Sequence, residues 1–381
     1  MFLITLSVIF LAAQRVYSQC TPLPTPLPRF GSLTATNVLP NPFVFYNGTA
    51  VASPADWNCR RQEIKTILQE YLFGYYPDHS KETVTATRSG NTISITVTAG
   101  GKSGKFSATL ALPSGATKDK PAPVMIVLGF GDSTFVSNGI ATATFDAGSV
   151  AADSNSKTGA FWSIYNGQDV GVLLAWGWGF HRVLDALIQV APEVDPKRVG
   201  VNGCSRYGKA ALAGGIFDDR ITVTNPQSSG VFGVSPFRFR YESGGWNERL
   251  ESNVNGAGWW TKSNLKEFIP DEKRLPLDSN FLASAVAPRA AVWDNGQGDA
   301  QMNPEGVAGV TFPSTQAVYK WLGATDNVGL ALRSGGHCDP SGTSNDIDFI
   351  KSILLGTTRT KNYANTSPYK AHPETYPWLT T

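Results

Sequence analysis

The sequence predicts an α/β fold of three layers, in which a central, mostly parallel sheet lies between two layers of helices. Short apolar runs that suit buried strands alternate along the chain with longer segments that have helical spacing. The run Pro123–Leu128 is wholly apolar, as expected of a strand covered on both faces. The run 198–203 leads through a tight turn into a helix-forming segment at 210–215.

The N-terminal part of the chain is expected to lie outside the folded core. Residues 1–18 are typical of a secretory signal peptide, because the apolar run Phe2–Ala13 is shorter than the ~20 residues that span a bilayer. Residues 19–55 form an N-terminal arm that is proline-rich over 19–29. We expect a single domain over 56–381, with no internal repeat, in a secreted, extracellular protein.

The elements of this domain follow from local patterns. Residues 56–76 have the apolar spacing of a helix, and 83–112 alternate as strands with turns at Gly90-Asn91 and Gly100-Gly101. The strand 123–128 ends in the glycine loop 129–131, which in hydrolases supplies contacts to an oxyanion. Later elements are expected as a helix at 173–190, strands at 220–224, 290–293 and 328–332, and a terminal helix at 346–355.

The net charge excludes two classes of partner. Lys and Arg number 32 and Asp and Glu number 30, giving a formal charge of +2. Binding to nucleic acid or to an anionic membrane needs a clustered basic face, and none is evident. Beyond residue 18, no segment is long and apolar enough for a membrane anchor. We expect a monomer.

Ser205 stands at the turn between the strand 198–203 and the helix that follows. A serine at such an elbow is exposed as a nucleophile, and the N-terminus of the helix directs partial positive charge at it. Gly203 and Gly208 give the turn the room that it needs. The usual elbow pattern is G-x-S-x-G, whereas here Tyr207 takes the place of the second glycine.

The string G-C-S-R-Y-G-K at 203–209 resembles the glucuronoyl esterase family, which carries G-C-S-R-x-G-K around its catalytic serine. The resemblance implies an α/β-hydrolase fold. It also implies cleavage of the ester that joins a glucuronic acid branch of xylan to lignin alcohols. It extends over most of the chain, through the segments 59–68, 100–103, 175–187, 226–230, 286–290 and 335–338.

His337 is the expected general base. It lies late in the chain among glycines, in agreement with the order serine, acid, histidine of this fold. His79, His181 and His372 are expected to be structural or surface residues. The alternative for His337 is a loop histidine with no catalytic part.

The acid partner of His337 is the position at which the sequence departs from the family. Relatives carry Pro-Gln-Glu-Ser-Gly where this chain has Pro226–Gly230, so Ser228 replaces the carboxylate. A serine has no charge to stabilise an imidazolium. Some relatives place the acid at the end of a later strand, and on that basis we expect Asp294 to orient His337. Asp294 could instead form a turn before Asn-Gly; Asp299 is a weaker alternative, and Asp339 is close to the histidine in sequence.

Four further residues are candidates for substrate contact. The resemblance implies that Arg206 steadies the oxyanion and that Lys209 hydrogen-bonds sugar hydroxyls, although both could be plain surface charges. Trp259 or Trp260 could stack on a pyranose ring or belong to the core. Other sugar contacts of the family are missing, because Ala300 replaces a tryptophan and Ala257 a glutamate.

Four cysteines allow three pairings. The resemblance implies Cys204–Cys338, which would hold two catalytic loops together, and Cys20–Cys59. Asn47 and Asn365 begin sequons for glycosylation.

The sequence therefore predicts a secreted serine carboxylic-ester hydrolase that acts on glucuronoyl esters of glucuronoxylan. Two alternatives remain: an esterase for another acylated polysaccharide such as acetyl xylan, and a catalytically inactive carbohydrate-binding descendant. No metal or organic cofactor is expected, because neither zinc-ligand spacing nor a dinucleotide glycine motif occurs.

Overall fold

The strand order of the sheet explains how distant segments of the chain come together. A computed structural model describes residues 20–129, 133–240 and 247–379. The expected signal peptide at 1–18 and most of the glycine loop at 129–131 lie outside these residues. The sheet runs in the order β1-β2-β3-β5-β4-β6-β7-β8-β9. The strands are β1 (Thr83–Ser89), β2 (Thr92–Ala99), β3 (Lys102–Ala111), β4 (Ala122–Leu128), β5 (Ala141–Phe145), β6 (Val194–Cys204), β7 (Val223–Gln227), β8 (Ala290–Gly296) and β9 (Val328–Arg333).

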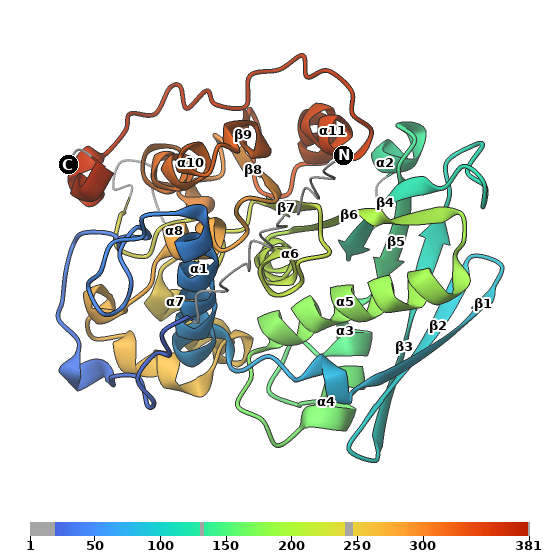
Figure 1. Cartoon of the computed structure of the whole chain (residues 1–381), viewed down its shortest axis with the longest axis horizontal. Helices are drawn as coiled ribbons and strands as arrows, with labels where there is room; N and C mark the ends of the chain where they lie inside the picture. Colours follow the sequence, from blue (N-terminus) through green and yellow to red (C-terminus); the bar gives the residue numbers. More distant parts are fainter. Residues whose placement is uncertain (1–19, 130–132, 241–246, 380–381) are drawn as a thin grey trace, which may run out of the picture.

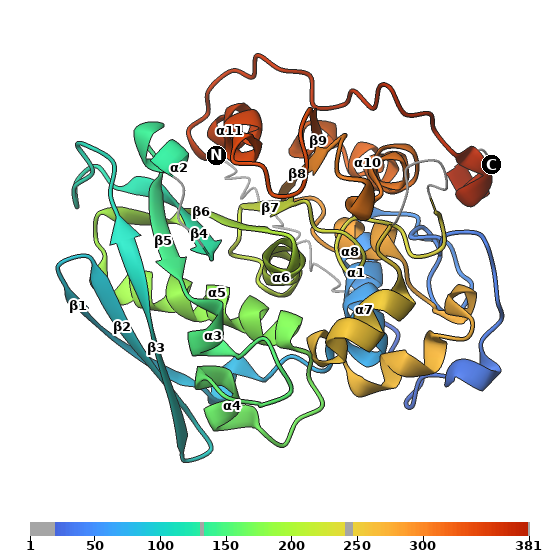
Figure 2. The same ribbon diagram turned by 180° about the vertical axis from the view of Figure 1, so that it is seen from behind.

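The sheet has an antiparallel part and a parallel part. Strands β1, β2, β3 and β5 pair antiparallel, whereas β5, β4, β6, β7, β8 and β9 pair parallel. Figure 2 shows the ribbon β1–β3 extending beyond the parallel part. Parallel strands end at the same edge, and the register places Cys204, Gln227 and Asp294 in one row across β6, β7 and β8. This row marks the edge at which the candidate site lies.

Helices cover both faces of the parallel strands (Figure 1). The helices are α1 (Pro54–Leu68), α2 (Ser133–Ser137), α3 (Ala147–Val150), α4 (Ala160–Tyr165), α5 (Val172–Val190), α6 (Arg206–Phe217), α7 (Leu250–Ala257), α8 (Ser279–Ser284), α9 (Pro304–Gly306), α10 (Phe312–Trp321) and α11 (Ser341–Leu354). Helix α1 begins at the cap Ser53, whose side chain accepts a hydrogen bond from the amide of Asp56. None of the helices in the described part of the chain is long and apolar enough to cross a membrane.

Two hydrophobic layers follow from the pleat of the strands. In β4, Val124 and Ile126 pack into the larger layer with α5 and α6, whereas Met125 and Val127 pack into the smaller layer with α11. All four side chains are buried. Burial on both faces explains the continuous apolar run of β4 and confirms the expected three layers.

Several element boundaries differ from the expected ones. The first helix ends at Leu68 and continues as a wider turn over Gln69–Phe73. The strand expected at 220–224 is β7, which begins at Val223, and the strand expected at 290–293 is β8, which continues to Gly296. The strand β5 was not among the predicted elements, although threonines alternate with apolar residues at 141–145.

Both expected disulfides are confirmed. Cys20 pairs with Cys59, which ties the N-terminal arm to α1, and Cys204 pairs with Cys338. The sequon residues Asn47 and Asn365 are exposed, as glycosylation requires, and their modification stays a prediction.

The two disulfides differ in the length of chain that they close, and this predicts different contributions to stability. The separation is 39 residues for Cys20–Cys59 and 134 residues for Cys204–Cys338. Loop-closure entropy makes the longer loop more stabilising by roughly 1 kcal/mol. We expect Cys204→Ala/Cys338→Ala to lower the free energy of unfolding in urea by more than Cys20→Ala/Cys59→Ala. The opposite order would contradict this entropic account.

Candidate active site

Ser205 lies at the sharp turn between β6 and α6. Its φ of 59° is in the left-handed region, which few residues other than glycine adopt, and a nucleophile elbow holds its serine in this strained conformation. Two glycines make the turn possible. A Cβ atom at Gly203 would lie 2.4 Å from the carbonyl oxygen of Tyr207, and one at Gly208 would lie 2.6 Å from that of Gln227. The second glycine of the motif thus lets α6 approach β7 closely.

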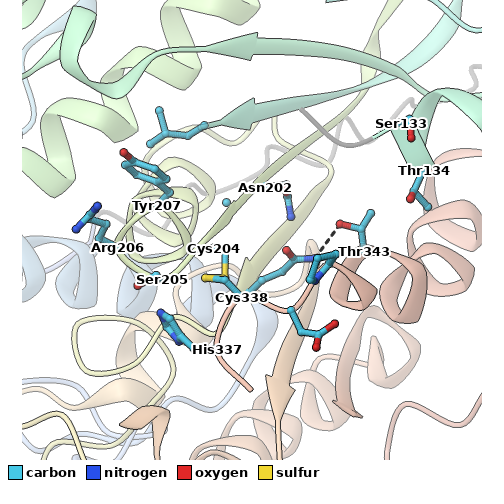
Figure 3. Close-up of a pocket in the computed structure, with 15 residues that line it drawn as sticks. Ser133, Thr134, Asn202, Cys204, Ser205, Arg206, Tyr207, His337, Cys338 and Thr343 are labelled. Atoms are coloured by element: carbon cyan, nitrogen blue, oxygen red, sulfur yellow. Dashed lines mark hydrogen bonds between the residues drawn. A yellow bond between two sulfur atoms is a disulfide. The ribbon is translucent and has the colours of Figure 1, made fainter. Parts of the chain in front are cut away.

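His337 and Asp299 form the contact that a general base requires. The Nδ1 atom of His337 lies 2.9 Å from Oδ2 of Asp299. The Asp299 side chain is 2 % exposed and that of His337 is 33 % exposed. Since a carboxylate only accepts hydrogen bonds, Nδ1 carries the proton and donates it. The Nε2 atom is then the basic nitrogen. Figure 3 shows the His337 ring directed toward Ser205.

The expected contact between Asp294 and His337 is absent, and Asp299 takes its place. Both carboxylate oxygens of Asp294 instead accept from Nε of Arg333, at 2.9 and 3.0 Å, and the side chain is fully buried. The cause is the length of β8. Asp294 is still within this strand, so the pleat directs its side chain to the same face as Val292, into the layer beside α11. Asp299 follows the strand and is free of this constraint.

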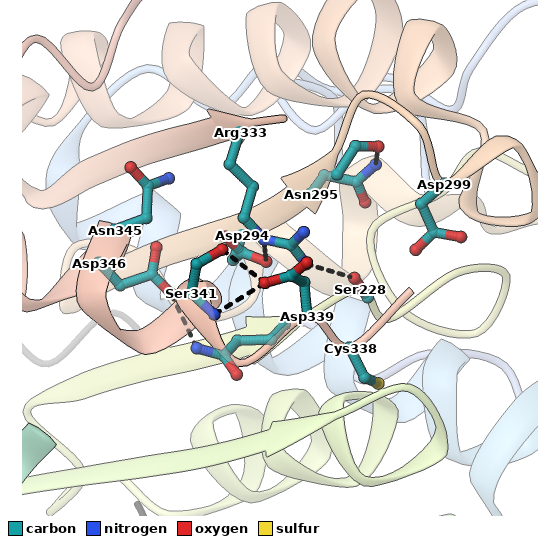
Figure 4. A network of polar contacts seen from close by, with 12 residues as sticks. Ser228, Asp294, Asn295, Asp299, Arg333, Cys338, Asp339, Ser341, Asn345 and Asp346 are labelled. Carbon is teal, nitrogen blue, oxygen red and sulfur yellow. Dashed lines mark hydrogen bonds and ion pairs between the residues drawn. The ribbon is translucent and has the colours of Figure 1, made fainter. Parts of the chain in front are cut away.

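Arg333 links Asp294 to the loop that carries His337. Its Nη1 atom donates to the carbonyl oxygen of Gly336 at 3.0 Å, and its Nη2 atom lies 3.5 Å from the hydroxyl of Ser228. The serine at the position of the family glutamate therefore contacts a buried guanidinium. Figure 4 shows Asp299 apart from this cluster.

A second buried carboxyl group, Asp346 of α11, lies beneath the site. Its Oδ2 atom accepts from the side-chain amides of Asn225 at 2.7 Å and Gln227 at 3.1 Å. Burial, together with the negative charge of Asp294, holds the pKa of Asp346 well above its usual range. Burial also raises the pKa of Asp294 to about 6, although Arg333 opposes this shift. The surroundings of Asp346 therefore favour its uncharged form.

The candidate nucleophile, base and oxyanion residue line one cavity of about 930 Å³. Ser205, Arg206 and His337 lie at one part of it, and the cavity continues past the disulfide to Asn202 and Thr343 (Figure 3); Gln227 also lines it. A cavity of this size suits a ligand of drug-like dimensions. Polar side chains from four separate segments thus converge on one volume, as a binding site requires.

The other predicted contacts lie around this cavity. Arg206 lines it, and its Nε atom lies 3.2 Å from Asp153. Lys209 does not line it. Its ammonium group is fully buried and donates to the carbonyl oxygens of Ser229 and Val231 and to the carboxylate of Glu248, at 2.7–2.8 Å. All three of its N–H groups are therefore used inside the protein.

Trp259 and Trp260 also lie outside the lining of this cavity. Both are partly buried against the larger hydrophobic layer, and both indole N–H groups donate to Asp153. The sequence offered no signal for Asp153 or Glu248, because the contact of Asp153 with Trp259 spans 106 residues and that of Glu248 with Lys209 spans 39 residues. Gln227 had a signal, since it belongs to the family segment 226–230.

Comparison with known proteins gives consistent results. A family model described as "Glucuronyl esterase, fungi" matches residues 95–323. The 4-O-methyl-glucuronoyl methylesterase of Podospora anserina is 36% identical over 84% of this chain and 68% of its own length. That of Thermothelomyces thermophilus is 35% identical over 84% of this chain and 81% of its own length.

Solved structures agree with these relatives. A carbohydrate esterase family 15 glucuronoyl esterase from Caldicellulosiruptor kristjansonii matches with a TM-score of 0.83 and 38% identity, over 88% of this chain and 95% of that one. A mutant glucuronoyl esterase from Sporotrichum thermophile, in complex with methyl 4-O-methyl-beta-D-glucopyranuronate, matches with a TM-score of 0.83 and 31% identity, over 91% and 96%. The α/β-hydrolase fold is thereby confirmed.

Two substitutions distinguish the parts of Asp299 and Asp294. Asp299→Asn keeps the size of the side chain but removes the charge beside His337, and we expect kcat to fall on the order of 10³-fold with little change in melting temperature. Asp294→Asn leaves Arg333 buried without its partner, and we expect the free energy of unfolding to fall by about 3–5 kcal/mol.

Steady-state rates on any ester that the enzyme cleaves, together with urea denaturation, measure both effects. A larger loss of kcat in folded Asp294→Asn than in Asp299→Asn would contradict the assignment of Asp299.

The raised pKa of Asp346 predicts a pH dependence of stability. Because its pKa is raised in the folded protein, folding takes up a proton, and stability from this group falls as the pH rises above the unfolded pKa. Asp346→Asn removes this cost. We expect its stability relative to the wild type to grow between pH 5 and pH 8, by up to about 1.4 kcal/mol per pH unit.

Asp348, on the same helix, is the matched control. Burial opposes the shift, but amide hydrogen bonds from Thr360 and Lys361 lower its pKa, so Asp348 is ionised in both the folded and the unfolded protein above pH 5 and Asp348→Asn should run parallel to the wild type over this range. Urea unfolding at several pH values measures both. If the free energy of unfolding changes with pH in parallel for Asp346→Asn and the wild type, Asp346 is ionised in the folded protein and the prediction is wrong.

Proposed function

Because the chain belongs to the glucuronoyl esterase family, we propose that it hydrolyses carboxylic esters of glucuronic acid or 4-O-methylglucuronic acid, with the alcohols of lignin as the natural leaving groups. The contact that carries this proposal is the hydrogen bond between His337 and Asp299, on the cavity that Ser205 lines. A serine at a strained elbow beside an imidazole oriented by a carboxylate is the arrangement that acyl transfer needs.

In the proposed reaction, the hydroxyl oxygen of Ser205 attacks the ester carbonyl carbon while Nε2 of His337 takes the hydroxyl proton. Asp299 holds the imidazole in the required tautomer and stabilises its positive charge. The tetrahedral intermediate collapses when His337 gives the proton to the leaving alcohol oxygen. Water then attacks the acyl carbon while His337 takes a proton from it. The bond to the Ser205 oxygen breaks as His337 gives that oxygen the proton, and the uronic acid is released.

The oxyanion of each tetrahedral intermediate forms beside Arg206. The backbone N–H of Arg206 follows the nucleophile directly, the usual position of one oxyanion donor in this fold. It is also one of the first N–H groups of α6, which have no partner within the helix. The guanidinium of the same residue adds positive charge where negative charge develops.

The protein is also proposed to act outside the cell. The apolar run Phe2–Ala13 supports an exported chain. Two disulfides and two exposed sequons suit an oxidising compartment. A cell-wall polysaccharide ester is available to an enzyme there.

The substrate is tested by comparing esters at equal pH. We expect kcat/KM to be higher on benzyl and methyl glucuronate than on methyl galacturonate and 4-nitrophenyl acetate, because recognition of the acyl sugar adds to transition-state binding. Ser205→Ala should reduce hydrolysis of every ester on the order of 10⁴-fold or more. Faster hydrolysis of acetylated xylan than of the glucuronate esters would show that the enzyme removes acetyl groups and would contradict the proposed uronate substrate. Absence of all ester hydrolysis would support the carbohydrate-binding alternative.

A further inference from the structure

Asp153 joins three donors from two separate segments beside the cavity. Its Oδ1 atom accepts from the indole nitrogens of Trp259 at 2.8 Å and Trp260 at 2.6 Å. Its Oδ2 atom lies 3.2 Å from Nε of Arg206. The residue lies in the loop between α3 and α4, far in sequence from both segments. One carboxylate therefore ties the nucleophile elbow to the tryptophan pair.

The contact fixes how the Arg206 guanidinium is presented. Its Nε atom is ion-paired with Asp153, and its guanidinium carbon lies over the ring of Tyr207, 5.5 Å from the centroid. Tyr207 is itself held edge-on by Trp176. Among the described residues, no other hydrogen bond or ion pair of Arg206 occurs, so Nη1 and Nη2 remain available on a side chain that lines the cavity with Ser205.

Stability alone does not account for this ion pair. The Arg206 side chain is 48 % exposed and that of Asp153 is 29 % exposed. Ion pairs in contact with water contribute little to folding, because they are screened and their long side chains lose entropy. What the pair does supply is orientation: a planar guanidinium held at Nε and over a ring cannot rotate freely. Orientation matters where a charge must meet a developing oxyanion.

We infer that Asp153 is a positioning residue, which holds the Arg206 guanidinium toward the oxyanion at Ser205 and couples it to the Trp259–Trp260 segment. This inference rests on the proposed part of Arg206 in ester hydrolysis. It assigns to Asp153 no contact with the substrate. A misplacement of about 1 Å in such a group can cost on the order of 10²-fold in rate.

Asp153→Asn is the informative substitution. An amide has a single acceptor oxygen, so it cannot accept from the indoles and from Arg206 at once. With the oxygen kept toward Trp259 and Trp260, its NH₂ group faces Nε of Arg206 and the ion pair is lost. We expect kcat to fall roughly 10- to 100-fold with KM nearly unchanged, because the lost interaction belongs to the transition state. Asp153→Glu should restore part of kcat.

Asp169→Asn is the matched control. Asp169 accepts from the amide and the hydroxyl of Ser263, three residues beyond Trp260, but it does not contact Arg206. The substitution Asp169→Asn should lower the melting temperature about as much as Asp153→Asn does, and it should leave kcat unchanged. Trp259→Phe and Trp260→Phe remove one indole donor each and test the coupling. A smaller loss of kcat than in Asp153→Asn is expected for both.

The decisive measurement is a double-mutant cycle of Asp153→Asn with Arg206→Ala. If Asp153 acts through Arg206, adding Asp153→Asn to Arg206→Ala costs no further kcat. Additive losses, or losses in Asp153→Asn that only follow its melting temperature, would overturn the inference.

A second readout separates this inference from the proposed function. Ser205 is labelled with a fluorophosphonate, whose phosphoryl oxygen occupies the oxyanion position. Slower labelling of Asp153→Asn than of Asp169→Asn supports the positioning of Arg206 even if no uronate ester is cleaved. Equal labelling rates for the two variants would overturn it, as would a wild type that is not labelled.

Discussion

The covalent link between Cys204 and Cys338 is the constraint on which the site depends. These cysteines are direct neighbours of Ser205 and His337, and their Cα atoms lie 5.8 Å apart. Chain segments separated by 134 residues are thereby held at the same edge of the sheet. The imidazole is on a loop with one-third of its side chain exposed, and loops of this kind are mobile unless they are tied down. The disulfide supplies this tie on one side, and Arg333 supplies another through Gly336.

The sequence predicted those parts of the site that depend on local patterns. Ser205 was predictable because the elbow needs glycines at fixed positions, and a Cβ at Gly203 or Gly208 would overlap backbone atoms. The alternation of apolar strands with helices predicted the three layers, because strands buried on both faces need helices on both sides. Both signals arise from short-range sterics and burial, which a single sequence records.

The acid partner could not be predicted because it depends on where a strand ends. Pairing of β8 with β9 continues through Gly296, so Asp294 is directed by the pleat toward Arg333 rather than toward His337. A shift of a few residues in the end of a strand changes which carboxylate lies in the loop beyond it and can contact the imidazole. The predicted contact of Lys209 with the sugar is not supported for a different reason. The burial of Lys209 depends on Glu248, and the sequence pattern around the elbow does not indicate this partner.

The row of Cys204, Gln227 and Asp294 at one edge has a consequence for the evolution of such sites. Because adjacent parallel strands finish side by side, the segments that follow β7 and β8 begin at the same edge of the sheet as Ser205. A carboxylate lost from the first segment, where Ser228 now stands, can be regained from the second without moving either Ser205 or His337.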